Sequence, residues 1–473
     1  MTVSARPAQA VPSVEFDPWL IRKLNQLEPC YASFPTEDHF SDDFTQDEYL
    51  QAVDGARAMG GRYPLSLSLH IPFCSSLCHF CACNRVIATD RNEVVTYLDH
   101  LKLEIDMQGK LFAGMNRVAQ LNFVGGGTSS YLSDDQMDGL LAHLQRWFQF
   151  APDHFGEYSI EIDPRTATPA HVRKLRAQGF NCASISVQDF DPEVQKAVNR
   201  IQSEGQTLAL IDAARRANFR SIGIDLVYGL PKQTLMTVAQ TLSKILAANP
   251  DRIAIHNYAH LPHIFKSPRR MAESELPSAE TRLDMLFLCI KRLIDAGYVY
   301  IGMDHFARPT DDFALAQRQG RLHRNFQGYS THDEADLISF GISAISTVGA
   351  TYSQNEKALN TYYRRIARNE LPIARGIRLT MDDLLRLIII RTLMCHFELS
   401  FSSIELSYPI VFKEYFVHEL ARLRELEQDG LVKIDDDWLT VTLKGRLLIR
   451  NICMIFDRHL NDSRESQQSP KAI

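Results

Sequence analysis

Four cysteines lie within ten residues of the chain, in the segment HIPFCSSLCHFCACN that begins at His70. Cys74, Cys78 and Cys81 follow a C-x3-C-x2-C pattern, and Cys83 comes two residues later. The pattern places three thiols on one tight loop, which suits a cubane iron–sulfur cluster in which each thiolate binds a different iron. The fourth iron is then left without a protein ligand. The spacing therefore predicts a site where an external molecule can bind the cluster and react.

Two other interpretations of these thiols are open. A structural zinc site usually combines paired C-x2-C knuckles across a longer spacer, and the chain has no second Cys or His pair at such a spacing. A redox dithiol needs only an isolated C-x2-C. Chance clustering is disfavoured because the other five cysteines are scattered singly, at Cys30, Cys182, Cys289, Cys395 and Cys453.

The composition is that of an ordinary globular protein whose length allows about two or three domains. The 51 Lys and Arg against 57 Asp and Glu give a net charge of -6, and no basic tract suggests a nucleic acid or an anionic membrane as partner. No apolar stretch approaches the ~18 residues that span a bilayer, and the first residues lack the pattern of a secretory signal. We expect a cytoplasmic protein whose cysteines bind metal rather than form disulfides.

Seven short apolar runs alternate with longer helical patterns from residue 65 onward. A polar arm precedes them over residues 1–55, with a helical piece near residues 45–59. Near-continuous apolar strands that alternate with helices predict a parallel sheet covered by helices, in a domain over residues 56–372. The seven runs are residues 65–71, 120–124, 158–162, 183–187, 221–227, 252–255 and 298–303.

Each run leads into polar or glycine-rich residues. Such groups at the ends of successive parallel strands are typical of an α/β-barrel active site. A doubly wound open sheet would also bind ligands at strand ends, but polar groups on every strand favour a partial (β/α) barrel around one site. In chain order these residues are the cysteine loop, Gly125 to Thr128, Glu161 and Asp163, Gln188 and Asp189, Asp225, His256, and Asp304 and His305.

A mainly helical C-terminal domain is predicted for residues 373–473. Thr380 to Asp383 form a helix-start signature. An acidic turn between two short strand-like runs, residues 431–434 and 438–441, and a helix over residues 443–455 complete a winged-helix-like order. Because no Lys/Arg cluster accompanies the wing, we favour a lid or packing role over DNA binding.

The cysteine loop resembles that of the radical S-adenosylmethionine enzymes. Four further segments are similar to oxygen-independent coproporphyrinogen III oxidase (coproporphyrinogen dehydrogenase), a family of heme biosynthesis, and the resemblance covers nearly the whole chain. These segments are IDLVYGLPKQT at 224–234, IGMDHFARP at 301–309, HRNFQGY at 323–329 and GRLLIRNICM at 445–454.

The resemblance implies a set of cofactor-binding residues. Cys74, Cys78 and Cys81 would ligate one 4Fe-4S cluster, and Cys83 would not. A first S-adenosylmethionine would lie at the position of Ser68 and at Gly126, Glu161 and Ile345. This family also has a second S-adenosylmethionine in the same cavity, whose contacts match Phe80, Cys83, Gly127, Thr128, Gln188, Arg200, Asp225 and Ala259.

Elementary chemistry agrees with these roles. The glycine turn allows backbone N–H groups to approach a carboxylate, Glu161 can accept from an ammonium, and Asp225 complements a sulfonium. Each residue also has a plainer interpretation: a tight turn for the glycines, a cap for Asp225, and ordinary surface contacts for Gln188 and Arg200. Their shared position at strand ends favours the binding roles.

The family reaction converts two propionates of coproporphyrinogen III to vinyl groups and carbon dioxide, giving protoporphyrinogen IX. A deoxyadenosyl radical takes hydrogen from the propionate β-carbon, and the residual electron goes to an acceptor. The resemblance thus implies a tetrapyrrole substrate and an external electron donor such as flavodoxin or ferredoxin, and we expect a monomer. The N-terminal arm and C-terminal domain would close the barrel mouth and exclude water.

The chain departs from the family pattern at three places near the predicted site. Ser68 replaces a tyrosine two residues before the histidine of HIPFC, Cys30 replaces an arginine of the N-terminal arm, and Ser129 and Ser130 replace Pro-Thr after the glycine turn. These changes suggest as an alternative a paralogue with altered activity, such as a radical methyltransferase or another radical enzyme. A heme-binding or trafficking relative without oxidase activity is a further alternative, although such relatives usually lack the cysteine that matches Cys83.

Overall fold

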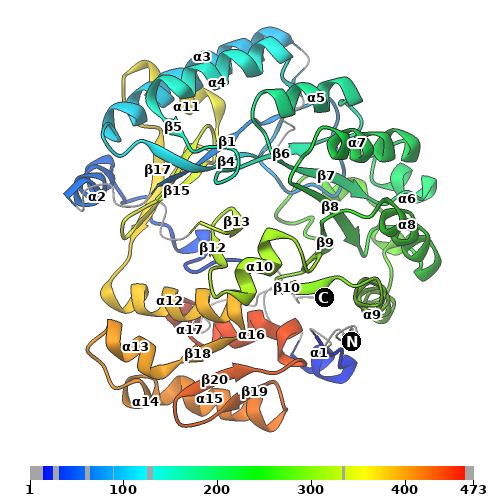
Figure 1. Cartoon of the computed structure of the whole chain (residues 1–473), viewed down its shortest axis with the longest axis vertical. Coiled ribbons are helices and arrows are strands. Elements are labelled where there is room, and N and C mark those ends of the chain that lie inside the picture. Colours follow the sequence, from blue (N-terminus) through cyan, green and yellow to red (C-terminus); the bar gives the residue numbers. More distant parts are fainter. Residues whose placement is uncertain are drawn as a thin grey trace, which may run out of the picture.

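The structure is a computed structural model that describes residues 14–24, 31–58, 64–88, 90–124, 131–332 and 336–463. A large curved sheet with helices on its outer side fills the upper part of Figure 1, and the C-terminal helices and a small sheet lie below it. Within the described residues, no helix is long and apolar enough to cross a membrane.

Six parallel strands form the centre of the large sheet, in the order β9-β8-β7-β6-β4-β1. All six coincide with apolar runs that the sequence predicts. Their outward faces are apolar and pack under the helices, as expected for a parallel sheet. The strands are β1 (Leu65–His70), β4 (Arg117–Val124), β6 (Glu157–Ile162), β7 (Cys182–Gln188), β8 (Ser221–Tyr228) and β9 (Arg252–Asn257).

The two edges of the sheet differ from the prediction. The seventh predicted strand, β10 (Val299–Gly302), does not pair with β9, because the antiparallel strand β11 (His305–Ala307) lies between them. At the other edge, β14 (Leu337–Phe340) runs parallel to β1 and is followed by three antiparallel strands. These are β15 (Ile345–Val348), β16 (Thr351–Asn355) and β17 (Ile373–Arg378), so the sheet continues beyond residue 372, where we predict a domain boundary.

Helices cover the outer face of the sheet, and polar side chains fix where most of them begin. Asp90, Ser133, Thr168, Ser203, Thr234 and Ser278 each accept a backbone N–H at a helix start. The helices are α3 (Arg91–Leu111), α4 (Asp134–Trp147), α5 (Pro169–Ala177), α7 (Glu204–Arg216), α8 (Leu235–Ala248), α9 (Ala279–Asp295) and α11 (Leu359–Ala367). Shorter elements are α6 (Pro192–Ala197), α10 (Asp312–Arg318), β5 (Gln149–Phe150), and the hairpin of β12 (His323–Asn325) and β13 (Gly328–Ser330).

The C-terminal region has the predicted winged-helix-like order. Thr380 and Asp383 form a capping box at the start of α12 (Met381–His396), as predicted. The helix predicted over residues 443–455 is instead a 3-10 turn, η5 (Gly445–Leu448), followed by α16 (Ile449–Met454). The other elements are α13 (Phe401–Ser407), α14 (Phe412–Tyr415), α15 (Val417–Gln428), α17 (Arg458–Ser463), and a sheet of β18 (Glu398–Ser400), β20 (Trp438–Val441) and β19 (Val432–Ile434).

The N-terminal arm contacts both the large sheet and the C-terminal region. Its first helix, α1 (Pro18–Leu24), is held by a contact of 2.6 Å between Lys23 and Asp429. The predicted helical piece is α2 (Gln46–Ala58), which packs on β15 and β16 and buries Tyr49. One continuous hydrophobic core joins the arm, the sheet and the C-terminal region.

Candidate active site

The cysteine loop lies directly after β1, at the C-terminal end of the parallel strands. Two short strands close it, because β2 (Phe73–Cys74) pairs with β3 (Val86–Ile87). The Tyr97 hydroxyl donates to the His70 carbonyl at 2.7 Å, and the Asn199 amide donates to the Leu77 carbonyl at 2.7 Å. Neighbouring elements on two sides therefore fix the position of the loop.

The thiols of this loop lie in an electropositive environment. Arg85 donates to the Cys81 carbonyl at 3.1 Å, and the Arg200 guanidinium lies 3.7 Å from the Cys78 sulfur. A hydrogen bond from Cys83 and the charge of Arg85 lower the pKa of Cys81 to about 6, against the effect of burial. Burial and the neighbouring thiols raise the pKa of Cys74 to about 12.

This donor set fits a cubane cluster. Thiolate is the ligand that iron–sulfur clusters take, and nearby guanidinium groups stabilise its charge. Within the described residues, no three His, Cys, Asp or Glu side chains converge closely enough to hold a single metal ion. A cubane needs no such convergence, because its irons are separate and each takes one thiolate.

Two carboxylates face the barrel interior beside this loop, Glu161 on β6 and Asp225 on β8. Between them, β7 presents Ser184 and Ser186 on one face, because alternate residues of a strand point to the same side. The Ser186 hydroxyl donates to Glu161 at 3.0 Å, and the Ser184 hydroxyl donates to Asp225 at 2.6 Å. The two hydroxyls therefore fix the orientation of both carboxylates.

The negative charge of this pair is only partly balanced. Burial and the charge of Asp225 raise the pKa of Glu161 to about 7. The nearest imidazole is that of His256 on β9, 4.0 Å from Asp225. A site with two adjacent carboxylates and a raised pKa is suited to bind a cationic ligand.

An ion-pair network links the carboxylate region to the cysteine loop. Asp163, which follows β6, contacts Arg165 at 2.5 Å and Arg200 at 3.3 Å. Although burial opposes the effect, both guanidinium groups hold the pKa of Asp163 below its usual range. Arg165 also donates to the Ser76 hydroxyl within the loop at 3.0 Å.

The C-terminal region contacts the residues that follow β10, next to His256. Arg450 of α16 pairs with Asp304 at 2.7 Å. The adjacent His305 ring packs edge-on against His256, with 6.0 Å between ring centroids. Burial and the charge of His256 lower the pKa of His305 to about 3, so this imidazole is neutral at physiological pH.

The other predicted residues are placed in different ways. Ser68 is buried on the inward face of β1, level with Asn122 on β4 and Ser339 on β14. Ile345 begins β15, and its carbonyl accepts the Ser339 hydroxyl at 2.6 Å. Gly126, Gly127, Thr128, Ser129, Ser130 and Cys30 lie outside the described residues.

Three further predicted residues, Gln188, Phe80 and Ala259, lie in other surroundings than Glu161 and Asp225. Gln188 ends β7 with a φ of 60° and lines a small, mostly apolar cavity with Leu226 and Tyr228. Phe80 packs in a small hydrophobic cluster with Tyr258, and Ala259 is the half-buried residue that follows. Asp189, which also follows β7, is bound by Gln233 and Thr241.

Sequence reasoning did not select several residues of the site. Ser184 and Ser186 are two residues apart in an otherwise apolar strand, and this spacing could have predicted a polar face directed into the barrel. Arg85 and Arg165 lie close to predicted residues, but no local pattern shows which way they point. Arg450 is 146 residues from its partner Asp304, so only the folded structure joins them.

Comparison with known proteins agrees with this geometry. The Radical SAM superfamily model matches residues 68–245, and the HemN C-terminal domain model matches residues 379–448. The thiol loop, the barrel and these matches define a radical S-adenosylmethionine enzyme, a class that uses a 4Fe-4S cluster and S-adenosylmethionine.

The chain is similar to curated relatives along almost its whole length. It is 46% identical to the oxygen-independent coproporphyrinogen III oxidase of Escherichia coli K12, over 98% of this chain and 100% of that protein. The Pseudomonas aeruginosa protein of the same name is 44% identical, over 95% of this chain and 97% of the relative. The solved structure of coproporphyrinogen III oxidase (HemN) from Escherichia coli matches with a TM-score of 0.89 at 46% identity, over 94% of this chain and 100% of that one. The chain therefore belongs to the oxygen-independent coproporphyrinogen III oxidase family.

Proposed function

We propose that the chain catalyses the oxygen-independent oxidative decarboxylation of coproporphyrinogen III to protoporphyrinogen IX in heme biosynthesis. The observation that carries this proposal is the proximity of the thiol loop to the carboxylates: the charge of Glu161 acts on Cys83, and Glu161 lies beside Asp225. The chain aligns with relatives that bear the oxidase name over nearly its full length. The tetrapyrrole substrate, an external electron donor, a monomeric state and a cytoplasmic location stay predictions.

Cys74, Cys78 and Cys81 would hold the cluster, with Cys83 as a neighbour that donates to Cys81. When bound, the cluster and S-adenosylmethionine supply the one-electron chemistry that removes hydrogen from the substrate. Arg85 and Arg200 would stabilise the thiolate charge during assembly. Ligation by these three cysteines is supported by their position after β1 and by the electropositive loop.

Glu161 and Asp225 would bind the cationic groups of S-adenosylmethionine, which carries an ammonium and a sulfonium. We assign the first molecule to Ser68, Gly126, Glu161 and Ile345. We assign the second to Phe80, Cys83, Gly127, Thr128, Gln188, Arg200, Asp225 and Ala259. The serine bonds to both carboxylates support this division, because they hold one carboxylate on each side of β7.

The arm and the C-terminal region would exclude water from the barrel. The Arg324 guanidinium donates to the Ala32 carbonyl of the arm at 3.1 Å. Arg450 reaches from α16 to Asp304 at the end of β10. Exclusion of water protects a reactive intermediate from side reactions.

Anaerobic incubation with S-adenosylmethionine, a reductant and coproporphyrinogen III tests the function directly. We expect protoporphyrinogen IX and deoxyadenosine in the mass spectrum, with the monovinyl product as an intermediate. Deoxyadenosine without decarboxylation would instead identify a radical enzyme with another substrate. Tight binding of heme without deoxyadenosine would identify a heme-binding relative.

A further inference from the structure

A cationic segment covers the outer side of the cysteine loop. Residues 258–272, YAHLPHIFKSPRRMA, follow β9 and contain Lys266, Arg269 and Arg270 without a single Asp or Glu. We call these residues the cationic cap. The contrast is local, because the chain as a whole has a net charge of -6.

The cationic cap is joined to the cysteine loop by direct contacts. The Arg85 guanidinium donates to the Cys81 carbonyl at 3.1 Å and to the Ser267 hydroxyl of the cap at 2.5 Å. Phe80 of the loop packs in a small hydrophobic cluster that includes Tyr258 and Met271 of the cap. The cap and the loop therefore form one packed unit at the mouth of the barrel.

The charges of the cap face solvent. Lys266, Arg269 and Arg270 are exposed, and none of them has an ion-pair partner within the described residues. Ile264 is 57% exposed among them. Glu273 and Glu275 follow the cap in the chain, and Glu275 pairs with Lys232 at 3.6 Å rather than with a cap residue. Exposed cations in the same segment as an exposed apolar side chain are typical of a protein contact surface.

A second cation extends this face on the other side of the loop. The His79 backbone N–H donates to the Val198 carbonyl at 2.9 Å, which joins the loop to the segment after α6. Lys196 at the end of α6 is exposed. The cap and the segment after α6 therefore both contact the loop that contains the three cysteines.

We propose that the cationic cap, with Lys196, is the docking surface of a small acidic electron-carrier protein of the flavodoxin type. This inference rests on the proposed function, which needs one electron from outside the chain. One electron leaves the reduced carrier and enters the cluster, with no bond made or broken. Opposite charges speed such encounters and make their rate depend on salt.

Charge reversal on the cap tests the proposal. We compare the reconstituted holoenzyme with its Lys266→Glu/Arg270→Glu variant in anaerobic stopped-flow reduction by photoreduced flavodoxin. We expect the second-order rate at low ionic strength to fall by about tenfold or more in the variant, and its salt dependence to flatten. Excess dithionite should reduce the same amount of cluster in both proteins.

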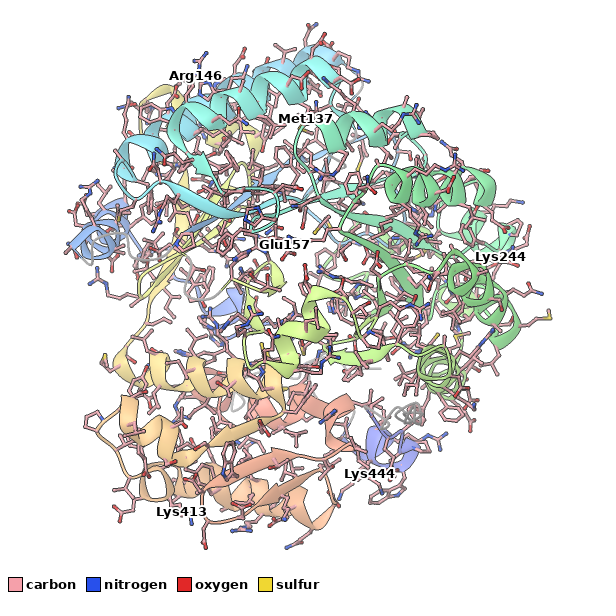
Figure 2. The ribbon with its side chains drawn as sticks, viewed as in Figure 1. Met137, Arg146, Glu157, Lys244, Lys413 and Lys444 are labelled. Atoms are coloured by element: carbon pink, nitrogen blue, oxygen red, sulfur yellow. The ribbon has the colours of Figure 1, made fainter. Side chains whose placement is uncertain are left out.

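Lys110→Glu/Arg146→Glu is the matched control, because it changes the net charge by the same amount. Both residues are exposed at the carboxyl ends of α3 and α4, away from the cysteine loop, and Arg146 is labelled in Figure 2. We expect the control to keep most of the carrier-driven rate.

Equal loss of rate in the two variants, or no loss in either, would overturn the docking site. Failure of the unaltered holoenzyme to cleave S-adenosylmethionine even with dithionite would instead remove the proposed function, and this proposal with it.

Discussion

The barrel interior contains two polar clusters that are built in opposite ways. The lower cluster comprises Glu157, Ser221, Arg252 and Asp311, near the N-terminal ends of the strands. Arg252 contacts Asp311 at 2.9 Å and Glu157 at 3.5 Å, and its guanidinium lies 3.4 Å from the centre of the Phe313 ring. The Ser221 hydroxyl donates to Asp311 at 2.8 Å. Glu157 is labelled near the centre of Figure 2.

The upper cluster comprises Glu161, Ser184, Ser186 and Asp225, near the cysteine loop. Here two carboxylates lie together and each accepts a serine hydroxyl. The charge of Arg200 lowers the pKa of Glu161, but burial and the charge of Asp225 outweigh it and raise that pKa to about 7. A buried charge is tolerated when the protein supplies its partner, as in the lower cluster. The lower cluster pairs its carboxylates with a guanidinium in direct contact, whereas the two adjacent carboxylates and the raised pKa of Glu161 suit the upper cluster to a cationic ligand.

The largest expected effect comes from the cysteine loop above the upper cluster. Cys74→Ser, Cys78→Ser and Cys81→Ser should each lose the cluster and all activity. Cys83→Ser should keep most of its iron, which is about four atoms per chain for a cubane cluster. Iron analysis and the visible spectrum of anaerobically reconstituted protein measure this. Zinc in place of iron in carefully prepared protein would contradict the cluster assignment.

Arg252→Ala should break the lower cluster by leaving two buried carboxylates without their cation. Loss of one partner from a buried ion pair costs about 3–5 kcal/mol, so we expect a marked fall in the unfolding midpoint. Asp225→Asn is the matched change in the upper cluster and should leave the midpoint unchanged or raised. Equal destabilisation by both variants would show that the two clusters have the same structural role.

Ser68→Tyr tests whether a departure from the family pattern limits activity. Ser68 is buried on the inward face of β1, where the family has a tyrosine beside the first S-adenosylmethionine. With the smaller serine side chain, S-adenosylmethionine is positioned less tightly, and misplacement of reacting groups by ~1 Å can lower the rate on the order of a hundredfold. We therefore expect low turnover in the native protein and higher turnover in the variant. Cys30→Arg should add to the gain. Full turnover in the unaltered protein, not exceeded by these variants, would show that the departures are neutral.

The raised pKa of Glu161 predicts a pH-dependent affinity. Below pH 7 this carboxyl is protonated and loses its attraction for an ammonium, so the Kd for S-adenosylmethionine should rise by up to about tenfold per pH unit on the acid side. Asp225→Asn removes the repelling charge and should shift this dependence to lower pH. Equilibrium dialysis between pH 5.5 and 8 measures both.

The same Asp225→Asn variant separates binding at the two predicted sites. It should keep the cluster and some cleavage of S-adenosylmethionine while losing coupled decarboxylation. Normal decarboxylation in this variant would remove the assigned role of Asp225.

The sequence was sufficient for the parts of the molecule whose signals are local. The six central strands bury apolar outward faces, so their apolar runs were visible, and Glu161 stood near the end of β6 and Asp225 within β8. The antiparallel strand β11 and the added strands β14 to β17 are defined by the strands with which they pair, and the local sequence does not indicate those partners. For the same reason the bonds of Ser184 and Ser186, and the reach of Arg450 to Asp304, required the folded structure.

The smallest predicted effect concerns the hydroxyl that orients Glu161. Ser186→Ala removes a donor at 3.0 Å, and a hydrogen bond to a charged group contributes about 1.5–3 kcal/mol at most. Because Glu161 remains and water can replace part of the bond, we expect the Kd for S-adenosylmethionine to rise only about fivefold, with the cluster content unchanged. Ser159→Ala, at an inward-facing serine of β6, is the matched control and should leave the Kd unchanged. The change in the electron paramagnetic resonance signal of the reduced cluster on adding S-adenosylmethionine reports binding independently of turnover. An equal response of the two serine variants would mean that Glu161 is held by other contacts, and the upper cluster would then owe its geometry to the strands alone.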